Sequence, residues 1–462
     1  MKNNNQMSFK RGIYSIAALA FALTPYATAN ADDGITTGTI DLTASYSASP
    51  GQQASIDAMQ NICGQPGMSS TSLACSLTGA GAFSSFSVFP ASFADNNSLG
   101  FQQLSPQSAM QAESISITSP YKFIRSVSQQ VQKLKDCEPG ENDTKKRSPE
   151  CGGGSGSDAY GFIGPFGVSF SGGGGFGDRD NSVGQTGFNI DTRQANLIID
   201  YPFAQDLIGG FSFGYLGTDR KLGLASGSLD SDSYRFAPFL SYTPTPDSYV
   251  TLMGGYARVD FNSTRSVSTS TNGATTITVS DATANYGADQ FFASLGGGYT
   301  HRMGAWSLRG YGRGDYSHSS IESFQESGAI ASDGFSYANK VNGQSILSAT
   351  STLGAELSYA FSTTTLAAVV IPKLHAEWVH EFKNSGRQIQ TTYNANKLDG
   401  TASFSADTSS IAVAGPERNW ANLGFGLQML FPHAIVGYLN YDTLFIENAS
   451  NQTVSGGVRV NF

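Results

Sequence analysis

Four polar residues on one extended segment are the best candidates for chemistry in this sequence. Lys373, His375, Glu377 and Glu381 share one face of that segment, because successive side chains of a β-strand point to opposite faces. A histidine beside carboxylates could act as a general base or help to bind a metal ion. The sequence shows no matching nucleophile and no second ligand cluster, so we favour a structural ladder of ion pairs in a wet interior.

A second candidate is the sequence GFSFG at residues 210–214, which matches G-x-S-x-G with Ser212 at the position of a nucleophile. A nucleophile elbow requires a strand, a sharp turn and then a helix. Here the alternation of a strand continues through the match, which we interpret as a chance match. The glycine run at 172–175 precedes no helix that could bind a phosphate, and we interpret it as a loop. We therefore expect no catalytic residue, no cofactor and no metal ion.

The four cysteines are Cys63, Cys75, Cys137 and Cys151. Four cysteines allow three pairings. We favour Cys63 with Cys75 and Cys137 with Cys151, because a short loop is easy to close and could still pass a narrow pore. No C-x-x-C spacing occurs, which argues against a zinc site or a thioredoxin-like site.

The amino-terminal residues predict a signal peptide at 1–31. Basic residues up to Arg11 precede an apolar run at 13–23, and residues 29–31 form an A-x-A cleavage site. This run is too short to span a membrane, since a spanning helix needs about 20 apolar residues. We expect cleavage after Ala31 and export of the mature protein to a compartment in which disulfides persist.

The composition favours many short amphipathic strands. Of the 462 residues only 14% are charged, and there are 53 glycines, 20 tyrosines and 30 phenylalanines. Average proteins have about a quarter charged residues. The net charge of −9 argues against a nucleic-acid-binding protein, which would normally carry a basic face.

From residue 160 to the end, twelve segments alternate between apolar and polar residues. These segments are 162–170, 197–203, 211–215, 234–242, 249–261, 291–299, 306–316, 347–361, 370–382, 423–431, 435–445 and 454–462. In the segment at 249–261 we place Tyr249, Met253, Ala257, Val259 and Phe261 on the apolar outer face. The opposite, polar face is predicted to line a wet lumen and holds Asp200, Arg235, Arg258, Asp260, Arg309, Arg313, Asp315, Glu356, Lys373, His375, Glu377, Glu381 and Arg459. Aromatic residues gather at the segment ends, and short connections alternate with long ones such as 320–342 and 383–419. This pattern predicts an all-β transmembrane barrel of about 12 antiparallel strands.

The part before the barrel is predicted to be small and mainly helical or irregular. Residues 54–62 favour a short helix. Residues 119–136 favour an amphipathic helix that begins at Ser119 and Pro120. Its polar side could meet the charged lumen as a plug, which we favour, or the helix could pack within the amino-terminal domain. Residues 137–158 resemble a flexible linker, so we divide the chain into a passenger at 32–136, this linker, and a barrel at 159–462.

Several motifs resemble the β-barrel translocator domain of autotransporters, the type V secreted proteins of Gram-negative bacteria. They are LHAEWVHEF, NWANLGFGLQMLF, FQESGA and the terminal VSGGVRVNF, together with LSPQSAMQAE and FIRSVSQQVQKL before the barrel. The resemblance covers roughly residues 161–462. It implies a 12-stranded outer-membrane barrel, a helix that threads the pore and a passenger delivered to the surface. The terminal Phe462 resembles the signal that the barrel assembly machinery reads.

The passenger departs from the large members of the family, because 32–157 shows no repeat and a β-helix needs several stacked repeats. We expect a non-enzymatic protein that displays its amino-terminal region for adhesion or self-association, with an unknown ligand. Outer-membrane lipid, the barrel assembly machinery, the secretory translocon and periplasmic chaperones are the expected partners, and nucleic acid is not. One alternative is a porin-like channel plugged by its amino-terminal segment. A weaker alternative is a barrel-embedded hydrolase.

Overall fold

The chain divides into two units, Met1–Leu42 and Thr43–Phe462, and all described residues belong to the second. The computed structural model describes residues 50–68, 72, 74–75, 106–135, 166–180, 187–204, 206–223, 227–266, 279–363, 368–413, 415–431, 435–447 and 449–461. The predicted signal peptide, the linker with Cys137 and Cys151, and Phe462 lie outside these residues.

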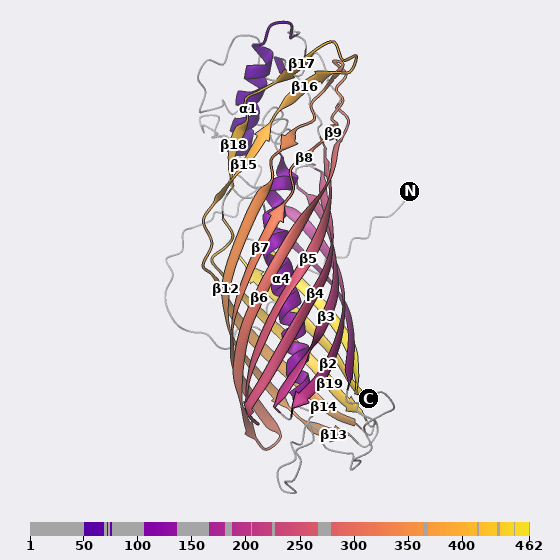
Figure 1. Cartoon of the computed structure of the whole chain (residues 1–462), viewed down its shortest axis with the longest axis vertical. Helices are drawn as coiled ribbons and strands as arrows, with labels where there is room; N and C mark the ends of the chain where they lie inside the picture. The colour runs from indigo at the N-terminus through magenta and orange to yellow at the C-terminus, as the bar shows by residue number, and fades with distance from the viewer. Residues whose placement is uncertain are drawn as a thin grey trace, which may run out of the picture. The chain divides into compact units, whose positions relative to one another are not determined.

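Twelve long antiparallel strands form a closed barrel, which confirms the predicted fold (Figure 1). Their bounds are β1 (Gly167–Arg179), β2 (Phe188–Ala204), β3 (Leu207–Leu222), β4 (Ser228–Thr245), β5 (Ser248–Arg265), β6 (Ala282–Met303), β7 (Trp306–Ile321), β12 (Gln344–Tyr359), β14 (Ala368–Glu381), β19 (Asn419–Phe431), β20 (Ile435–Ile446) and β21 (Ala449–Asn461). The pairing of β12 with β14 and of β1 with β21 completes the ring. The short strand β13 (Phe361–Thr363) pairs with the start of β14.

The two ends of the barrel differ in their connections. At one end, which we call the turn end, short connections such as 246–247 and 304–305 join the strands. At the other, the loop end, long connections follow β5, β7 and β14. The longest strand, β6, has 22 residues, whereas a tilted strand needs only about 10 to cross a membrane. The barrel is therefore longer than the membrane is thick.

The predicted alternation is confirmed for most strands but is wrong for β5. Leu252 of β5 has 55% of its surface exposed on the outer face, whereas Met253 is 2% exposed and points inward. Tyr249, Ala257, Val259 and Phe261 share the inward face with Met253. Arg258 and Asp260, which we expected in the lumen, are half-exposed on the outside instead. The error arose because β5 has apolar residues on both faces, and its inward ones pack inside the barrel.

The glycine run also differs from the expectation, because it belongs to β1 and is not a loop. A Cβ atom at Gly173 would lie 2.6 Å from the carbonyl oxygen of Val454, and one at Gly175 would lie 2.7 Å from that of Gln452. Both distances are shorter than van der Waals contact allows. The glycines therefore permit the close approach of the first strand to the last.

Two long connections fold into small sheets at the loop end. Strands β8 (Phe324–Gln325), β11 (Lys340–Val341), β15 (Arg387–Thr392) and β18 (Ser409–Val413) form a four-stranded sheet, and β10 (Phe335–Ser336), β16 (Asn394–Lys397) and β17 (Ser403–Ser405) form a three-stranded one. A further strand, β9 (Ser327–Gly328), pairs with β6. We call the two sheets together the loop sheets. The connections that we expected to be loops are therefore structured.

The described residues contain two long helices, α1 (Pro50–Cys63) and α4 (Gln107–Lys135). The predicted start of α4 at Ser119 is wrong, because the helix begins at Gln107 and contains Pro120. Proline removes a backbone N–H, and such a site is tolerated where neighbouring groups bind the backbone. The carbonyl oxygen that loses its helical donor is that of Ser116, four residues earlier. Arg235 donates hydrogen bonds to the carbonyl oxygen of Ser119, at 3.1 Å, and to its hydroxyl, and so anchors the residue before the proline to β4. In the described part of the chain, no helix has the length and apolarity needed to cross a membrane.

Candidate functional site: the helix in the barrel lumen

Helix α4 runs through the barrel, with its start at the loop end and its last turns toward the turn end (Figure 1). Its 29 residues correspond to about 43 Å at 1.5 Å per residue. Near its start, Arg387 of β15 donates a hydrogen bond of 3.2 Å to the carbonyl oxygen of Ala109. Near its end, the side-chain amide of Gln130 donates to the hydroxyl of Ser171 in β1 at 2.9 Å.

One side of α4 is apolar and packs against an apolar part of the lumen wall. The helix contributes Phe123, Ile124, Val127 and Val131. The wall contributes residues of β2 to β6, namely Ile198, Ile208, Ala237, Phe239, Met253, Ala257 and Phe292. The rings of Phe123 and Phe292 meet edge to face with centroids 5.7 Å apart, a favourable geometry for aromatic pairs. The side chain of Leu134 lies outside the described residues.

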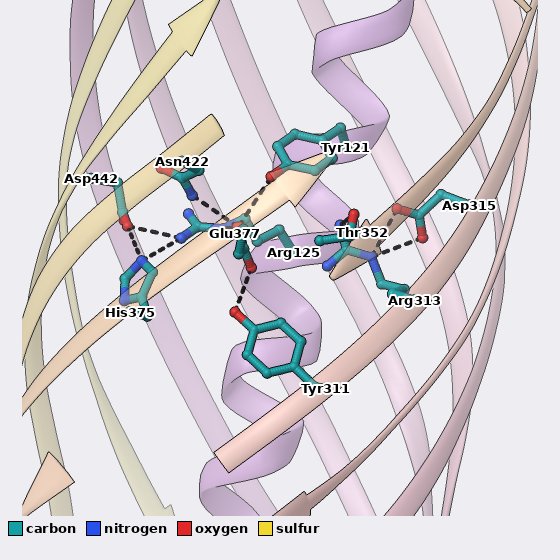
Figure 2. A network of polar contacts seen from close by, with 10 residues as sticks. All are labelled: Tyr121, Arg125, Tyr311, Arg313, Asp315, Thr352, His375, Glu377, Asn422 and Asp442. Carbon is teal, nitrogen blue, oxygen red and sulfur yellow. Dashed lines mark hydrogen bonds and ion pairs between the residues drawn. The ribbon is translucent and has the colours of Figure 1, made fainter. Parts of the chain in front are cut away.

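The opposite side of α4 carries Arg125, which forms ion pairs with two barrel strands (Figure 2). Its Nε lies 2.6 Å from Glu377 Oε2 of β14, and its Nη2 lies 2.9 Å from Asp442 Oδ1 of β20. The Nε2 atom of His375 is 2.6 Å from Arg125 Nη2 and 2.7 Å from Asp442 Oδ1. We call these four residues the Arg125 centre. Only 10% of the Arg125 side chain and 1% of the Glu377 side chain are exposed.

The carboxylate of Glu377 has three further partners. It accepts hydrogen bonds from Tyr121 of the helix at 3.1 Å, from Tyr311 of β7 at 2.8 Å and from Asn422 of β19 at 3.0 Å (Figure 2). Buried charges are tolerated when they are paired and hydrogen-bonded. The Arg125 centre therefore ties α4 to four strands on this side of the barrel.

A second arginine lies next to this centre without pairing to Glu377. Arg313 of β7 forms an ion pair with Asp315 at 2.8 Å and donates to Thr352 at 3.5 Å. Its guanidinium carbon is 5.4 Å from the centroid of the Tyr121 ring, within the range of a cation–π interaction. The interaction holds Tyr121 on the side from which it reaches Glu377.

The predicted ladder residues all lie inside the barrel, but they do not form one cluster. His375 and Glu377 belong to the Arg125 centre, whereas Lys373 forms an ion pair with Glu356, with 3.6 Å between Lys373 Nζ and Glu356 Oε1. Glu381 instead accepts hydrogen bonds from the Ser348 hydroxyl and the backbone N–H of Ala349. Ion pairs and hydrogen bonds thus occupy these side chains, in agreement with the ladder interpretation.

Ser212 is buried in the middle of β3 and pairs in register with Ile198 and Ala237. The strand continues beyond it, so the strand-turn-helix geometry of a nucleophile elbow is not formed. Among the described residues, no group of three or more His, Cys, Asp and Glu side chains is placed to hold a metal ion.

The sequence reasoning missed the central role of Arg125 and of its partner Asp442. Asp442 lies on the polar face of its segment, so the alternation could have placed it in the lumen. Arg125 follows Tyr121 by four residues, which puts both on one face of a helix. What the sequence does not contain is a signal that pairs this helix face with β14 and β20.

A polar cavity remains beside α4, between the helix and strands β1, β2, β19, β20 and β21. Lys122, Gln129 and Gln130 line it from the helix, and Asn440 and Asn451 line it from the wall. Lys122 donates a hydrogen bond of 2.7 Å to Asn451. The cavity has a volume of about 50 Å³, enough for a few water molecules.

The family model of the autotransporter β-domain matches residues 168–442, which is more than half of the chain. The chain belongs to the autotransporter family. The predicted family, the barrel fold and the location in the outer membrane of a Gram-negative bacterium are thereby confirmed. Domains of this family insert into the outer membrane and support secretion of a passenger.

Two solved structures are similar to this autotransporter chain in fold. The translocator domain of the autotransporter NalP from Neisseria meningitidis has a TM-score of 0.48 and 14% identity, and the match covers 66% of this chain and 92% of that one. The β domain of the Bordetella autotransporter BrkA has a TM-score of 0.43 and 12% identity, with 64% and 100% covered. The comparison with curated proteins gives no match.

Proposed function

We propose that this barrel exports its own amino-terminal region and displays it at the cell surface. The observation that carries the proposal is the direction of α4 in the lumen. Its start contacts β15 of the loop sheets, and β1 begins at the turn end, where Gly167 pairs with Asp200 and Asn461. A chain that had passed outward through the barrel would be left in this arrangement, provided that the loop end faces the exterior.

Long external loops and short periplasmic turns are the rule for outer-membrane barrels. The outer surface supports the same orientation. Toward the loop end, β5 carries Arg258 and Asp260 and β6 carries Asp289, all half-exposed on the outside of the barrel. Exposed ion pairs of this kind suit water and not lipid. The wet section of the strands therefore lies at the loop end, beyond the membrane.

The role of the displayed region is proposed to be adhesion or self-association, with a ligand still to be identified. Phe462 is proposed as the signal for the barrel assembly machinery, and the secretory translocon and periplasmic chaperones as partners in export. A non-catalytic role agrees with the buried, mid-strand position of Ser212 and with the paired state of His375.

An epitope inserted next to Asp57 tests display directly, because Asp57 is exposed on α1. Protease added to intact cells should remove the epitope while a periplasmic control protein survives. If the epitope is cut only after the outer membrane is opened, the region does not reach the surface and the proposal is wrong.

The second candidate function is a plugged channel, which the polar cavity beside α4 favours. If α4 gates a pore, deletion of residues 107–135 should raise the single-channel conductance in planar bilayers and the wild-type chain should open reversibly. If export is the function, the wild-type chain should show only a small, constant conductance. Epitope accessibility on intact cells separates the two functions independently of conductance.

A further inference from the structure

Helix α1 lies against the loop sheets and shares a hydrophobic core with them (Figure 1). From the helix, Ile56, Ala58, Met59 and Ile62 enter this core, and Met59 and Ile62 are fully buried. The loop sheets and neighbouring residues contribute Ala282, Ala329, Ala331, Phe335, Tyr337, Tyr393, Ala395, Phe404 and Ala406. The apolar side of α1 is thus covered by residues that follow the first barrel strands in the sequence.

Polar contacts fix the position of this segment on the sheets. The hydroxyls of Ser55 and Tyr393 are 3.1 Å apart in the buried interface. The amide of Gln65 donates to the carbonyl oxygen of Ser405 at 2.8 Å, and the backbone N–H of Ala74 donates to the Tyr337 hydroxyl at 3.4 Å. Burial raises the pKa of both Tyr337 and Tyr393 far above the usual range, as expected for phenols enclosed by a folded core.

A disulfide joins Cys63, at the end of α1, to Cys75. It keeps the chain after the helix close to the loop sheets, where Ala74 is also fully buried. A bidentate ion pair between Arg265 and Glu326 ties the loop end of β5 to the connection after β7. The loop-sheet side of this interface is therefore also held by a contact that does not involve α1.

The exported segment cannot complete this core without the barrel. Helix α1 has 14 residues, and isolated helices of about this length are marginal in water. Ala54 joins a core that also contains the start of α4, and the other buried apolar side chains of α1 pack in the core shared with the loop sheets and their neighbours. Docking and folding of the segment must therefore occur together, as in coupled folding and binding.

We infer that the loop sheets are the receptor for α1 and for Ala74 and Cys75 of the same chain, which fold on them after emerging at the loop end and then stay docked. This inference rests on the proposed export, which it deepens by naming what the exported segment binds first. A docked and folded segment cannot return through a lumen that α4 already fills. The displayed region is thus held on the barrel and presents its outward side, including Asp57.

Two thiol reporters test the inference in the full-length protein on intact cells. Asp57→Cys places a thiol on the exposed side of α1, and Ala58→Cys places one on the buried side. Both are made with Cys137→Ser and Cys151→Ser, so that the Cys63–Cys75 disulfide is the remaining native pair. A membrane-impermeant maleimide should label Asp57→Cys rapidly. It should label Ala58→Cys at no more than about a tenth of that rate, because a buried thiol reacts only through local opening.

A matched pair of loop substitutions then tests whether the loop sheets provide the protection. Ala395→Asp puts a charge into the shared core, where Ala395 is fully buried, whereas Leu398→Asp changes a side chain that is 57% exposed on the same connection. Ala395→Asp should bring the labelling rate of Ala58→Cys close to that of Asp57→Cys, and Leu398→Asp should leave the two rates different. In each variant, a difference in gel migration between unheated and heated samples shows that the barrel is folded.

The outcomes separate the inference from the function on which it rests. If Asp57→Cys is labelled only after the outer membrane is opened, the proposed display fails. If Asp57→Cys and Ala58→Cys are labelled equally fast on intact cells, display stands and docking is overturned. If Ala395→Asp leaves Ala58→Cys protected while the barrel is folded, the loop sheets are not the receptor.

Discussion

Replacement of Arg125 by methionine should loosen α4 in the lumen while the barrel stays closed. Methionine retains most of the length of the side chain but removes its charge. The ion pairs of 2.6 Å to Glu377 and 2.9 Å to Asp442 are then lost, and two carboxylates remain inside the barrel without their cation. Breaking a buried ion pair by removing one partner costs about 3–5 kcal/mol.

The lower end of this range applies here. Glu377 keeps its hydrogen bonds from Tyr121, Tyr311 and Asn422, and Asp442 borders the polar cavity, where water can approach it. We therefore expect the free energy that holds α4 in place to fall by about 3 kcal/mol. Since 1.4 kcal/mol is a factor of ten, the population in which α4 is released should rise about 100-fold.

Hydrogen exchange of the α4 amides in the folded protein measures this change. The amides of α4 should exchange about 100-fold faster in Arg125→Met, because exchange follows the equilibrium of local opening. The amides of strands β4 and β5, away from the Arg125 centre, should keep their rates. Lys122→Met is the matched control: it removes a charge from the same helix, with one described hydrogen bond to Asn451, and should change exchange less than tenfold, at about 1 kcal/mol.

A triple variant completes the test. Addition of Glu377→Gln and Asp442→Asn to Arg125→Met removes the unpaired charges and should recover part of the loss, since replacement of all members of a buried ion pair is often nearly neutral. Unchanged α4 exchange in Arg125→Met would refute the reasoning. A triple variant that is looser by the sum of the separate effects would show that the groups act independently and not as one centre.

Three further predictions follow from the packing. A nitroxide label at Leu252→Cys should collide with membrane-dissolved oxygen and one at Met253→Cys should not, because only the former side chain is outward; the opposite pattern would overturn the orientation of β5. Gly214→Val should loosen α4 by about 1–3 kcal/mol through overpacking, because a Cβ atom there would lie 2.5 Å from the Phe123 ring. Gly314→Val is the control, since a Cβ atom at that position would have no atom within 4 Å. Equal α4 hydrogen exchange in the two variants would contradict the packing. Cys63→Ser should weaken the docking of the segment that contains α1 by about 3 kcal/mol, as expected for a loop of this size. Proteinase K should then cut this segment faster, as it should in reduced wild-type protein, and unchanged cleavage would count against a stabilising disulfide.

The barrel could be predicted from the sequence because the two-residue period of a strand is visible without any knowledge of its neighbours. The same reasoning failed at β5, where the inward residues Met253 and Ala257 are as apolar as the outward ones. Alternation identifies the lipid face only when the other face is polar. Where α4 fills the lumen with apolar side chains, that condition does not hold.

The loop sheets could not be predicted from the sequence, and the start of α4 was misplaced at Ser119, each for its own reason. Strands β8 and β10 have two residues each, which is too short for a periodic pattern. Strand β11 pairs with β15, although the barrel strands β12 and β14 lie between them in the sequence. Pro120 is a local signal for a helix start, but the helix continues through it inside the barrel, where Arg235, 115 residues later in the chain, binds the carbonyl oxygen of Ser119. Both failures concern contacts between distant segments, which local patterns do not report.

The two-sided lumen bears on when export must occur. An open passage would favour a wall that is polar all round, as in a porin. This lumen instead has an apolar side that matches Phe123 and Val127 and a charged side that matches Arg125. A chain in transit cannot satisfy both sides at every step, whereas α4 satisfies them in one register. The wall is therefore fitted to the state in which α4 is in place, and under the proposed export that state is the end of transit.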